Sequence, residues 1–246
     1  MWCKLTVLPV KKTFLYLLRW AYLALVIFCA VYLAMEWMSR TEWYKERLYQ
    51  RLISGNVKQQ LRAASALARL NGQAQLLQGL KAQAPPVREL ARRALEHIWF
   101  NAAGDEAYHL IEAAYKASEK EDLPAALAIL NRLVEKYPKF AEGWNRRAAV
   151  FWQMGEWEKS IHDSERTLAL NPHHYGAWQG IGVCRLQLGD IAEACRCLRA
   201  ALKILPYDDK TRDSLERCEE LLRLFPHPTK KKKQMDLIMQ GATRNA

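Results

Sequence analysis

Two histidine pairs are the side chains of this chain most suited to acid–base chemistry. His173 stands next to His174, and His162 stands next to Asp163. Adjacent residues on a helix point to different sides, so neither pair converges on one substrate atom. The sequence also lacks a phosphate-binding loop, a paired-histidine zinc motif and a nucleophile elbow. We therefore expect no enzyme and no cofactor, and we assign the histidines to capping or solvent-facing roles.

The cysteines lack the spacing of a metal site. The chain has six of them. Cys195 and Cys197 are two residues apart on a predicted helix and so point to different sides, while Cys184 and Cys218 match no ligand spacing. Cys184 and Cys195 fall on two consecutive predicted helices and could approach each other, but the sequence shows no bond. We predict no metal site and expect the cysteines to be small buried residues.

The elements that carry these residues form a repeat of 34 residues. Pro138, Pro172 and Pro206 keep that spacing, and Trp144 recurs as Trp178. Three further pairs keep the step or twice the step: Gly155 and Gly189, Leu168 and Leu202, and Ala126 and Ala194. Because proline cannot continue a helix, each proline should end one unit and turn the chain into the next. A 34-residue period with tryptophan near the start, small residues in the middle and proline near the end is the tetratricopeptide pattern.

The chain resembles the tetratricopeptide repeat family over residues 107–225. Within that family it is similar to uncharacterised bacterial membrane-anchored repeat proteins, which carry stretches like 140–148 and 170–177. The resemblance implies an all-α fold with repeats at 107–140, 141–174 and 175–208. A capping helix at 210–225 should cover the last repeat, because stacked helical hairpins need a closed end.

Two arginines occupy repeat positions that are usually apolar. These are Arg147 and Arg185. Each is either an edge residue or the partner of an acidic side chain, and Asp163 on the facing helix suits Arg147. We favour a structural ion pair there over a contact with a ligand.

The resemblance also implies a concave groove lined by the first helix of each repeat. Ten residues fall on its lining positions: Ile111, Tyr115, Asn145, Ala149, Trp152, Gln153, Gln179, Val183, Leu186 and Gln187. This lining carries little charge and suits an amphipathic helix or an extended apolar peptide. The alternative for Trp152 is packing against the neighbouring repeat.

A chaperone-tail receptor is disfavoured by the same comparison. Members of the family that bind chaperone tails grip a carboxylate with Lys, Asn and Arg at five set positions. Here those positions hold Ile111, Tyr115, Arg146, Gly176 and Gly180. None of them matches.

Residues 14–35 are predicted to form a transmembrane helix. The stretch is almost wholly apolar with Arg19 as its only charge, and about twenty helical residues cross a bilayer core. Its flanks carry aromatic residues, and the leading segment 1–13 is basic. A cleaved signal peptide is the alternative, but cleavage after Ala34 would put Tyr32 where a small residue is needed.

Residues 36–106 form a predicted helical spacer that is possibly HEAT-like. The pattern of 63–70 recurs at 91–98, with a partner helix expected at 73–82 and a turn at Pro85 and Pro86. The alternative is a plain spacer that lifts the repeats off the membrane.

The excess positive charge lies outside the repeats. The net charge is +11, yet residues 107–225 carry 17 basic and 18 acidic side chains. The only dense cluster is Lys230 to Lys233, in a basic flexible tail at 226–246. Nucleic acid is therefore an unlikely partner, and anionic lipid is at least as good a target for the tail.

These features together predict a single-pass membrane protein that works as a noncatalytic scaffold for a protein or peptide partner. One alternative is structural self-assembly into a homo-oligomer, and another is binding of anionic lipid or nucleic acid through the lysine tail. In a bacterium the membrane would be the inner one. The purely basic leading flank favours repeats outside the cytoplasm, although Arg40, Lys45 and Arg47 follow the span.

Overall fold

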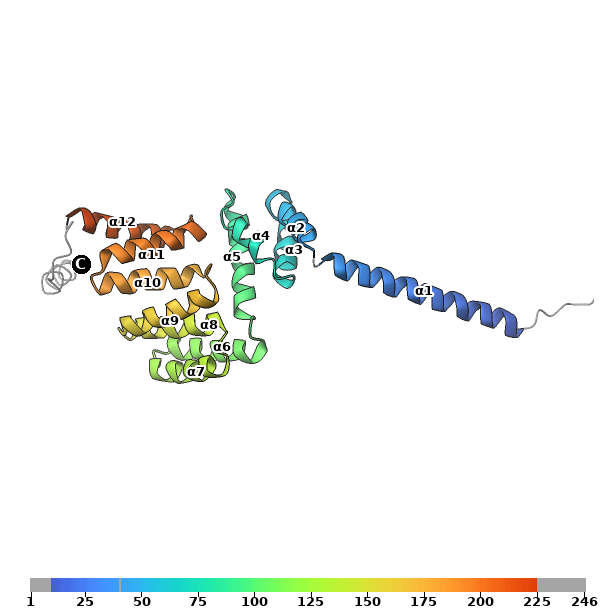
Figure 1. The fold of residues 1–246 in the computed structure, drawn as a ribbon, viewed down its shortest axis with the longest axis horizontal. Helices are drawn as coiled ribbons and strands as arrows, with labels where there is room; N and C mark the ends of the chain where they lie inside the picture. Colours follow the sequence, from blue (N-terminus) through green and yellow to red (C-terminus); the bar gives the residue numbers. More distant parts are fainter. Residues whose placement is uncertain (1–9, 40, 225–246) are drawn as a thin grey trace, which may run out of the picture.

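A computed structural model describes residues 10–39 and 41–224, and helices joined by short turns make up those ranges. The first helix, α1 (Val10–Ser39), projects from a packed body formed by the other helices (Figure 1). The body begins with α2 (Glu42–Ser54), α3 (Val57–Arg69), α4 (Gln73–Gly79) and α5 (Pro85–Phe100). No strand occurs in the described ranges, and the all-helical fold expected from the sequence is confirmed.

Helix α1 has the length and hydropathy of a membrane span over residues 16–34. None of that segment is buried against the rest of the chain. A signal sequence near an N-terminus has the same properties, so the helix fits either role.

Helices α2 to α5 share one apolar core. Leu52, Leu67, Leu76 and Leu95 each come from a different helix and are fully buried in it. The partner helix expected at 73–82 is shorter than expected and ends at Gly79. The turn expected at Pro85 and Pro86 is wrong, because both prolines begin α5. Proline is suited to this place, since its missing N–H would have no partner in the first turn of a helix.

Three helical hairpins follow and stack in chain order (Figure 1). They are α6 (Asp105–Glu119) with α7 (Leu123–Lys136), α8 (Ala141–Gln153) with α9 (Trp157–Leu170), and α10 (Tyr175–Gln187) with α11 (Ile191–Ile204). Close packing depends on small residues. A Cβ added at Gly182 would lie 2.8 Å from the side chain of Leu198 on the partner helix.

The loop inside each hairpin turns through a left-handed residue at the same repeat position. Gly155 has φ of 76° and Gly189 has φ of 80°, whereas the first repeat has Glu121 there with φ of 60°. The left-handed region favours glycine, so Glu121 is under local strain. The aspartates Asp122 and Asp190 follow this residue and cap α7 and α11.

Trp144 and Trp178 fasten the turns between repeats. The indole N–H of Trp144 donates to the backbone carbonyl of Pro138 at 3.0 Å, and that of Trp178 donates to Pro172 at 3.2 Å. Both rings are half-buried. The 34-residue spacing of proline and tryptophan therefore corresponds to one contact made twice.

Helix α12 (Asp209–Leu224) covers the last hairpin by packing on α11. Cys218 is fully buried there, and Leu215 and Leu222 are partly buried beside it. Leu224, at the end of this helix, is exposed. The lysine tail lies outside the described residues.

Candidate partner-binding groove

The first helices of the hairpins, α6, α8 and α10, lie next to one another in the stack. The ten residues predicted to line their concave side fall into three groups. Tyr115, Ala149, Trp152, Gln153 and Gln187 are exposed, Asn145, Gln179, Val183 and Leu186 are half-buried, and Ile111 is buried.

Two aromatic side chains dominate the exposed group. Tyr115 on α6 is 56% exposed, and Trp152 on α8 is 43% exposed. The nearest aromatic neighbour of Trp152 is Trp157 of its own repeat, at 6.4 Å between ring centroids. Large aromatic side chains that stay open to solvent are typical anchors of protein interfaces.

The end of the groove nearest α12 is filled by the chain itself. The side-chain amide of Gln179 donates to Asp208 at 3.0 Å and to Thr211 at 2.6 Å. Leu186 packs on the apolar core between α11 and α12. These two residues therefore hold the capping helix, and the exposed residues of the predicted lining lie on α6 and α8, apart from Gln187 at the end of α10.

Helix α5 docks against the stack of repeats, which sequence reasoning did not foresee. The indole ring of Trp99 stacks on the imidazole of His174, with ring centroids 4.8 Å apart. The hydroxyl of Tyr175 donates to the carboxylate of Glu96 at 2.7 Å. Two further contacts are cation–π pairs: Arg146 lies over Phe100, and Arg88 lies over Tyr207. The spacer is thus fixed to the repeats.

A buried ionic cluster lies behind this contact and joins the second and third repeats. Glu142 and His174 are both almost fully buried. Nδ1 of His174 accepts a hydrogen bond from the backbone N–H of Ala177 at 3.2 Å and so caps α10. Because Nδ1 is an acceptor, the ring proton is on Nε2, which donates to the carboxylate of Glu142 at 2.8 Å. Nε of Arg146 donates to the other carboxylate oxygen at 2.6 Å.

The pKa of Glu142 reflects two opposed effects. Burial raises it, while the hydrogen bond from His174 and the charge of Arg146 lower it. The second effect is larger, and the pKa lies below its usual value of 4.5. Glu142 is therefore an ionised carboxylate held inside the protein. His174 has the capping role assigned to it from sequence, and His173 is exposed.

A cleft of about 400 Å³ opens between α5, α6 and α8. Its lining residues include two of the predicted groove residues, Ile111 and Tyr115, together with aromatic and polar side chains of the neighbouring helices. The lining consists of Glu96, His97, Phe100, Asn101, Tyr108, Ile111, Glu112, Tyr115 and Arg146. Because α5 forms one wall, the cleft exists only when the spacer is docked on the repeats.

The two arginines at unusual positions have different surroundings. Arg147 makes a bidentate pair with Asp163, with nitrogen–oxygen distances of 2.6 and 2.9 Å, so the predicted structural ion pair is confirmed. Arg185 lies 3.9 Å from Glu165 and 3.8 Å from Asp190, and its buried Nε has no hydrogen-bond partner among the described residues.

Four of the cysteines are buried and free. Burial raises the pKa of the thiols of Cys197 and Cys218 to about 11. Cys184 and Cys195, which could have met, lie in separate apolar clusters. Within residues 10–39 and 41–224, no group of three or more His, Cys, Asp or Glu side chains is placed to hold a metal ion.

Comparison with known proteins agrees with the repeat pattern. A family model described as "Tetratricopeptide repeat" matches residues 111–164 and 145–209. A TPR repeat-containing protein of Rhizobium etli is 29% identical over 167 residues, covering 68% of this chain and 80% of that protein. Tetratricopeptide repeat protein 33 of Homo sapiens is 29% identical over 122 residues, covering 45% of this chain and 47% of that protein.

Solved structures are similar to about half of this chain. The first TPR domain of Spaghetti (RPAP3), bound to the HSP90 peptide SRMEEVD, is 19% identical with a TM-score of 0.47. It covers 48% of this chain and 93% of that domain. This chain spans about half the length of the human relative.

Proposed function

We propose that this chain, whose residues 111–209 are tetratricopeptide repeats, is a noncatalytic scaffold that is anchored in a membrane and binds another protein. Its ligand is a helical or extended apolar segment of that protein. The binding surface is the open part of the groove on α6 and α8, continued by the cleft beside α5.

One observation carries the proposal: two large aromatic side chains are exposed on adjacent helices of this surface. The rings of Tyr115 and Trp152 are largely apolar, and leaving apolar area exposed to water is unfavourable by about 25 cal/mol per Å². A partner that covered both rings would recover this free energy. Aromatic anchors of this kind lose roughly 1–3 kcal/mol of binding free energy when they are truncated.

The charges of the surface argue against a carboxylate-bearing chaperone tail. Arg146 is the only basic side chain at the five positions that grip such a tail in the family, and it already donates to Glu142. Gly176 and Gly180 offer no side chain at two of the other positions. The ligand of the Spaghetti domain is therefore a poor guide to the ligand of this chain.

The groove is tested by affinity capture with the full chain in its native membrane. Tyr115→Ala and Trp152→Ala should each reduce the captured partner about 5- to 100-fold, the range that corresponds to 1–3 kcal/mol. Leu224→Ala is the matched control, because Leu224 is an exposed apolar residue at the far end of α12. Equal capture by all four proteins would refute the groove as the binding surface.

The anchor is α1, which presents an apolar and unburied stretch over 16–34. A helix of this kind suits a bilayer, because its apolar side chains contact lipid and its backbone hydrogen bonds are all made within the helix. The full chain should stay in the membrane pellet after alkaline carbonate extraction and keep the mass of all 246 residues. Release into the supernatant, or a mass lacking the first helix, would instead mean a peripheral protein or a cleaved signal.

A further inference from the structure

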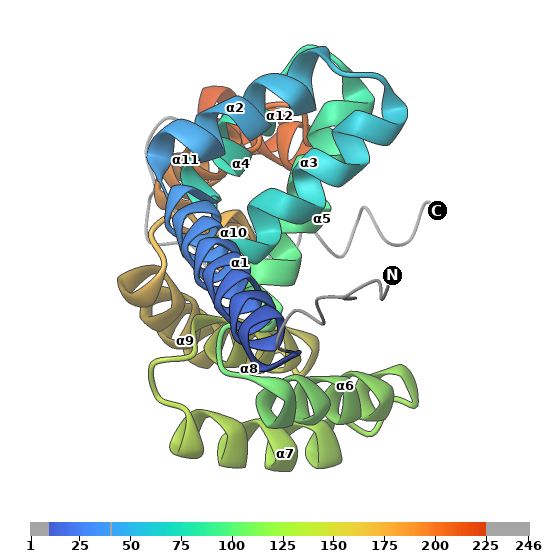
Figure 2. The ribbon, with the colours of Figure 1, turned by 90° about the vertical axis from the view of Figure 1, so that its right-hand side faces the viewer.

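Helices α2 and α3 form the part of the body nearest to α1. Helix α1 ends at Ser39 and α2 begins at Glu42, so the start of α2 is within a few residues of the proposed membrane span. Both helices lie on the α1 side of α5 (Figure 1) and stand in front of it when the body is viewed from that side (Figure 2). The inference drawn here rests on the proposed membrane anchor.

The outward side of these two helices carries large apolar side chains among its polar ones. Leu48, Leu52 and Leu67 bury the inner side in the core shared with α4 and α5. On the outer side Trp43 is 59% exposed and Leu61 is 55% exposed. Val57, at the start of α3, is 79% exposed. Val57 and Leu61 are one helical turn apart and so share a side of α3, and large apolar side chains left open to solvent suit a binding surface.

Basic side chains accompany these apolar residues, and the acidic ones, Glu42 and Glu46, lie only in the first half of α2. Between Glu46 and Glu89 the sequence has seven Lys or Arg residues and no Asp or Glu. Arg47, Lys58 and Arg62 are exposed, and none forms an ion pair with the described part of the chain. Arg47 lies over the ring of Trp43 at 5.6 Å. The nearby Glu42 is already hydrogen-bonded to Lys45.

We propose that this outer side is a second membrane contact that lies on an anionic lipid surface where α1 enters the bilayer. The contact consists of Trp43, Arg47, Val57, Lys58, Leu61 and Arg62, and we name it the lipid-contact face. Tryptophan prefers the headgroup level of a bilayer, and long basic side chains reach phosphate while their stems cover apolar area. Each basic residue near an anionic leaflet strengthens the attraction roughly fivefold.

Lipid explains this face better than a protein partner does. Three of the six residues of the face are basic, α3 carries no acidic residue, and the face adjoins a helix with the properties of a membrane span, so the nearest large surface of opposite charge is a leaflet of anionic lipid. Contact there would hold α5, and with it the cleft of the groove, at a fixed distance from the membrane.

The test is hydrogen exchange measured by mass spectrometry on the full chain in lipid nanodiscs. Discs of phosphatidylcholine alone are compared with discs that also contain phosphatidylglycerol. We expect amide exchange in the segment 57–65 to be about fivefold slower in the anionic discs, and the difference to shrink at high salt. The double variant Lys58→Glu with Arg62→Glu should remove the difference.

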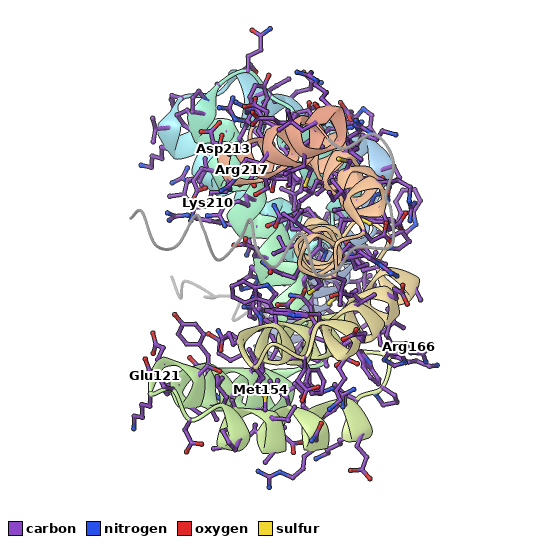
Figure 3. All side chains as sticks on the ribbon, turned by 90° about the vertical axis from the view of Figure 1, so that its left-hand side faces the viewer. Glu121, Met154, Arg166, Lys210, Asp213 and Arg217 are labelled. Carbon is purple, nitrogen blue, oxygen red and sulfur yellow. The ribbon has the colours of Figure 1, made fainter. Side chains whose placement is uncertain are left out.

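A matched control is the double variant Lys210→Glu with Arg217→Glu. Both residues are exposed on α12, on the opposite side of the body from α1 (Figure 3), so this variant should keep the slow exchange. Equal exchange of the parent in both kinds of disc, or slow exchange that survives Lys58→Glu with Arg62→Glu, would overturn the lipid-contact face. If amide exchange in 57–65 slowed only after a membrane extract was added to the discs, the face would bind a protein partner, and this result would also overturn the lipid-contact face. Loss of the chain from both kinds of disc would refute the anchor itself.

Discussion

Replacing His174 by alanine should destabilise the protein through three separate contacts. Its Nδ1 caps α10, its Nε2–H donates to the buried Glu142, and its ring stacks on Trp99. Loss of an N-cap costs about 1 kcal/mol, and loss of an aromatic stack about 0.5–1.5 kcal/mol. A buried oxygen left without its donor costs about 1–3 kcal/mol more. The free energy of unfolding should therefore fall by about 3–5 kcal/mol.

The neighbouring residue supplies the control. His173→Ala changes the same residue type in the same turn, but His173 is exposed and its side chain has no hydrogen bond among the described residues. Thermal melting of the full chain in detergent, followed by circular dichroism, should show a melting temperature lower by about 6–20 °C for His174→Ala, at roughly 2–4 °C per kcal/mol for a domain of this size. His173→Ala should melt within about 1–2 °C of the parent, as surface substitutions do. Equal melting of the two variants would refute the reasoning.

Three further predictions concern acid stability, the strained loop and topology. The pKa of Glu142 in the folded protein lies below 4.5, so its ionised form contributes stability that is present above about pH 4.5 and is lost as the pH falls through the folded-state pKa. The difference in melting temperature between the parent and Glu142→Gln should therefore shrink below pH 4.5. A difference that stays constant with pH would contradict this prediction. Glu121→Gly should stabilise the protein by about 0.5–1 kcal/mol in urea unfolding. The change removes the cost of about 1–2 kcal/mol that a side chain incurs in the left-handed region, and it adds the smaller backbone-entropy cost of glycine. The control Lys120→Gly, at φ of −88°, should destabilise the protein. In a bacterial host, alkaline phosphatase fused after Ala246 should be active and a fluorescent protein fused there should be dark, because the leading flank is purely basic; the opposite pattern would place the repeats in the cytoplasm.

The repeat fold could be predicted from sequence because its contacts recur at a fixed spacing. Proline, tryptophan and the left-handed glycine return every 34 residues, and each return marks the same local structure. The pair of Arg147 with Asp163 could be predicted for the same reason, since the geometry of one hairpin places position 147 opposite the facing helix.

The docking of α5 could not be predicted in this way. The bond between Tyr175 and Glu96 joins residues that are 79 positions apart, and no periodic pattern relates them. Tyr175 begins a repeat helix, so the family resemblance gave it no role outside the stack. The same limit applies to Gln179, whose position matched a groove residue but whose amide is bound by the capping helix. A clue was present in the apolar pair Trp99 and Phe100 at the end of α5, whose rings reach His174 and Arg146 of the repeats.

Photo-crosslinking in living cells tests the central claim most directly. A photo-reactive amino acid is placed at position 115 or 152 of the full chain, and at position 224 as the control, because all three side chains are exposed but only the first two belong to the groove. The account predicts a covalent adduct with another protein from positions 115 and 152 and none from position 224. Adducts from position 224 alone, or none from either groove position, would contradict the claim that this surface binds a partner.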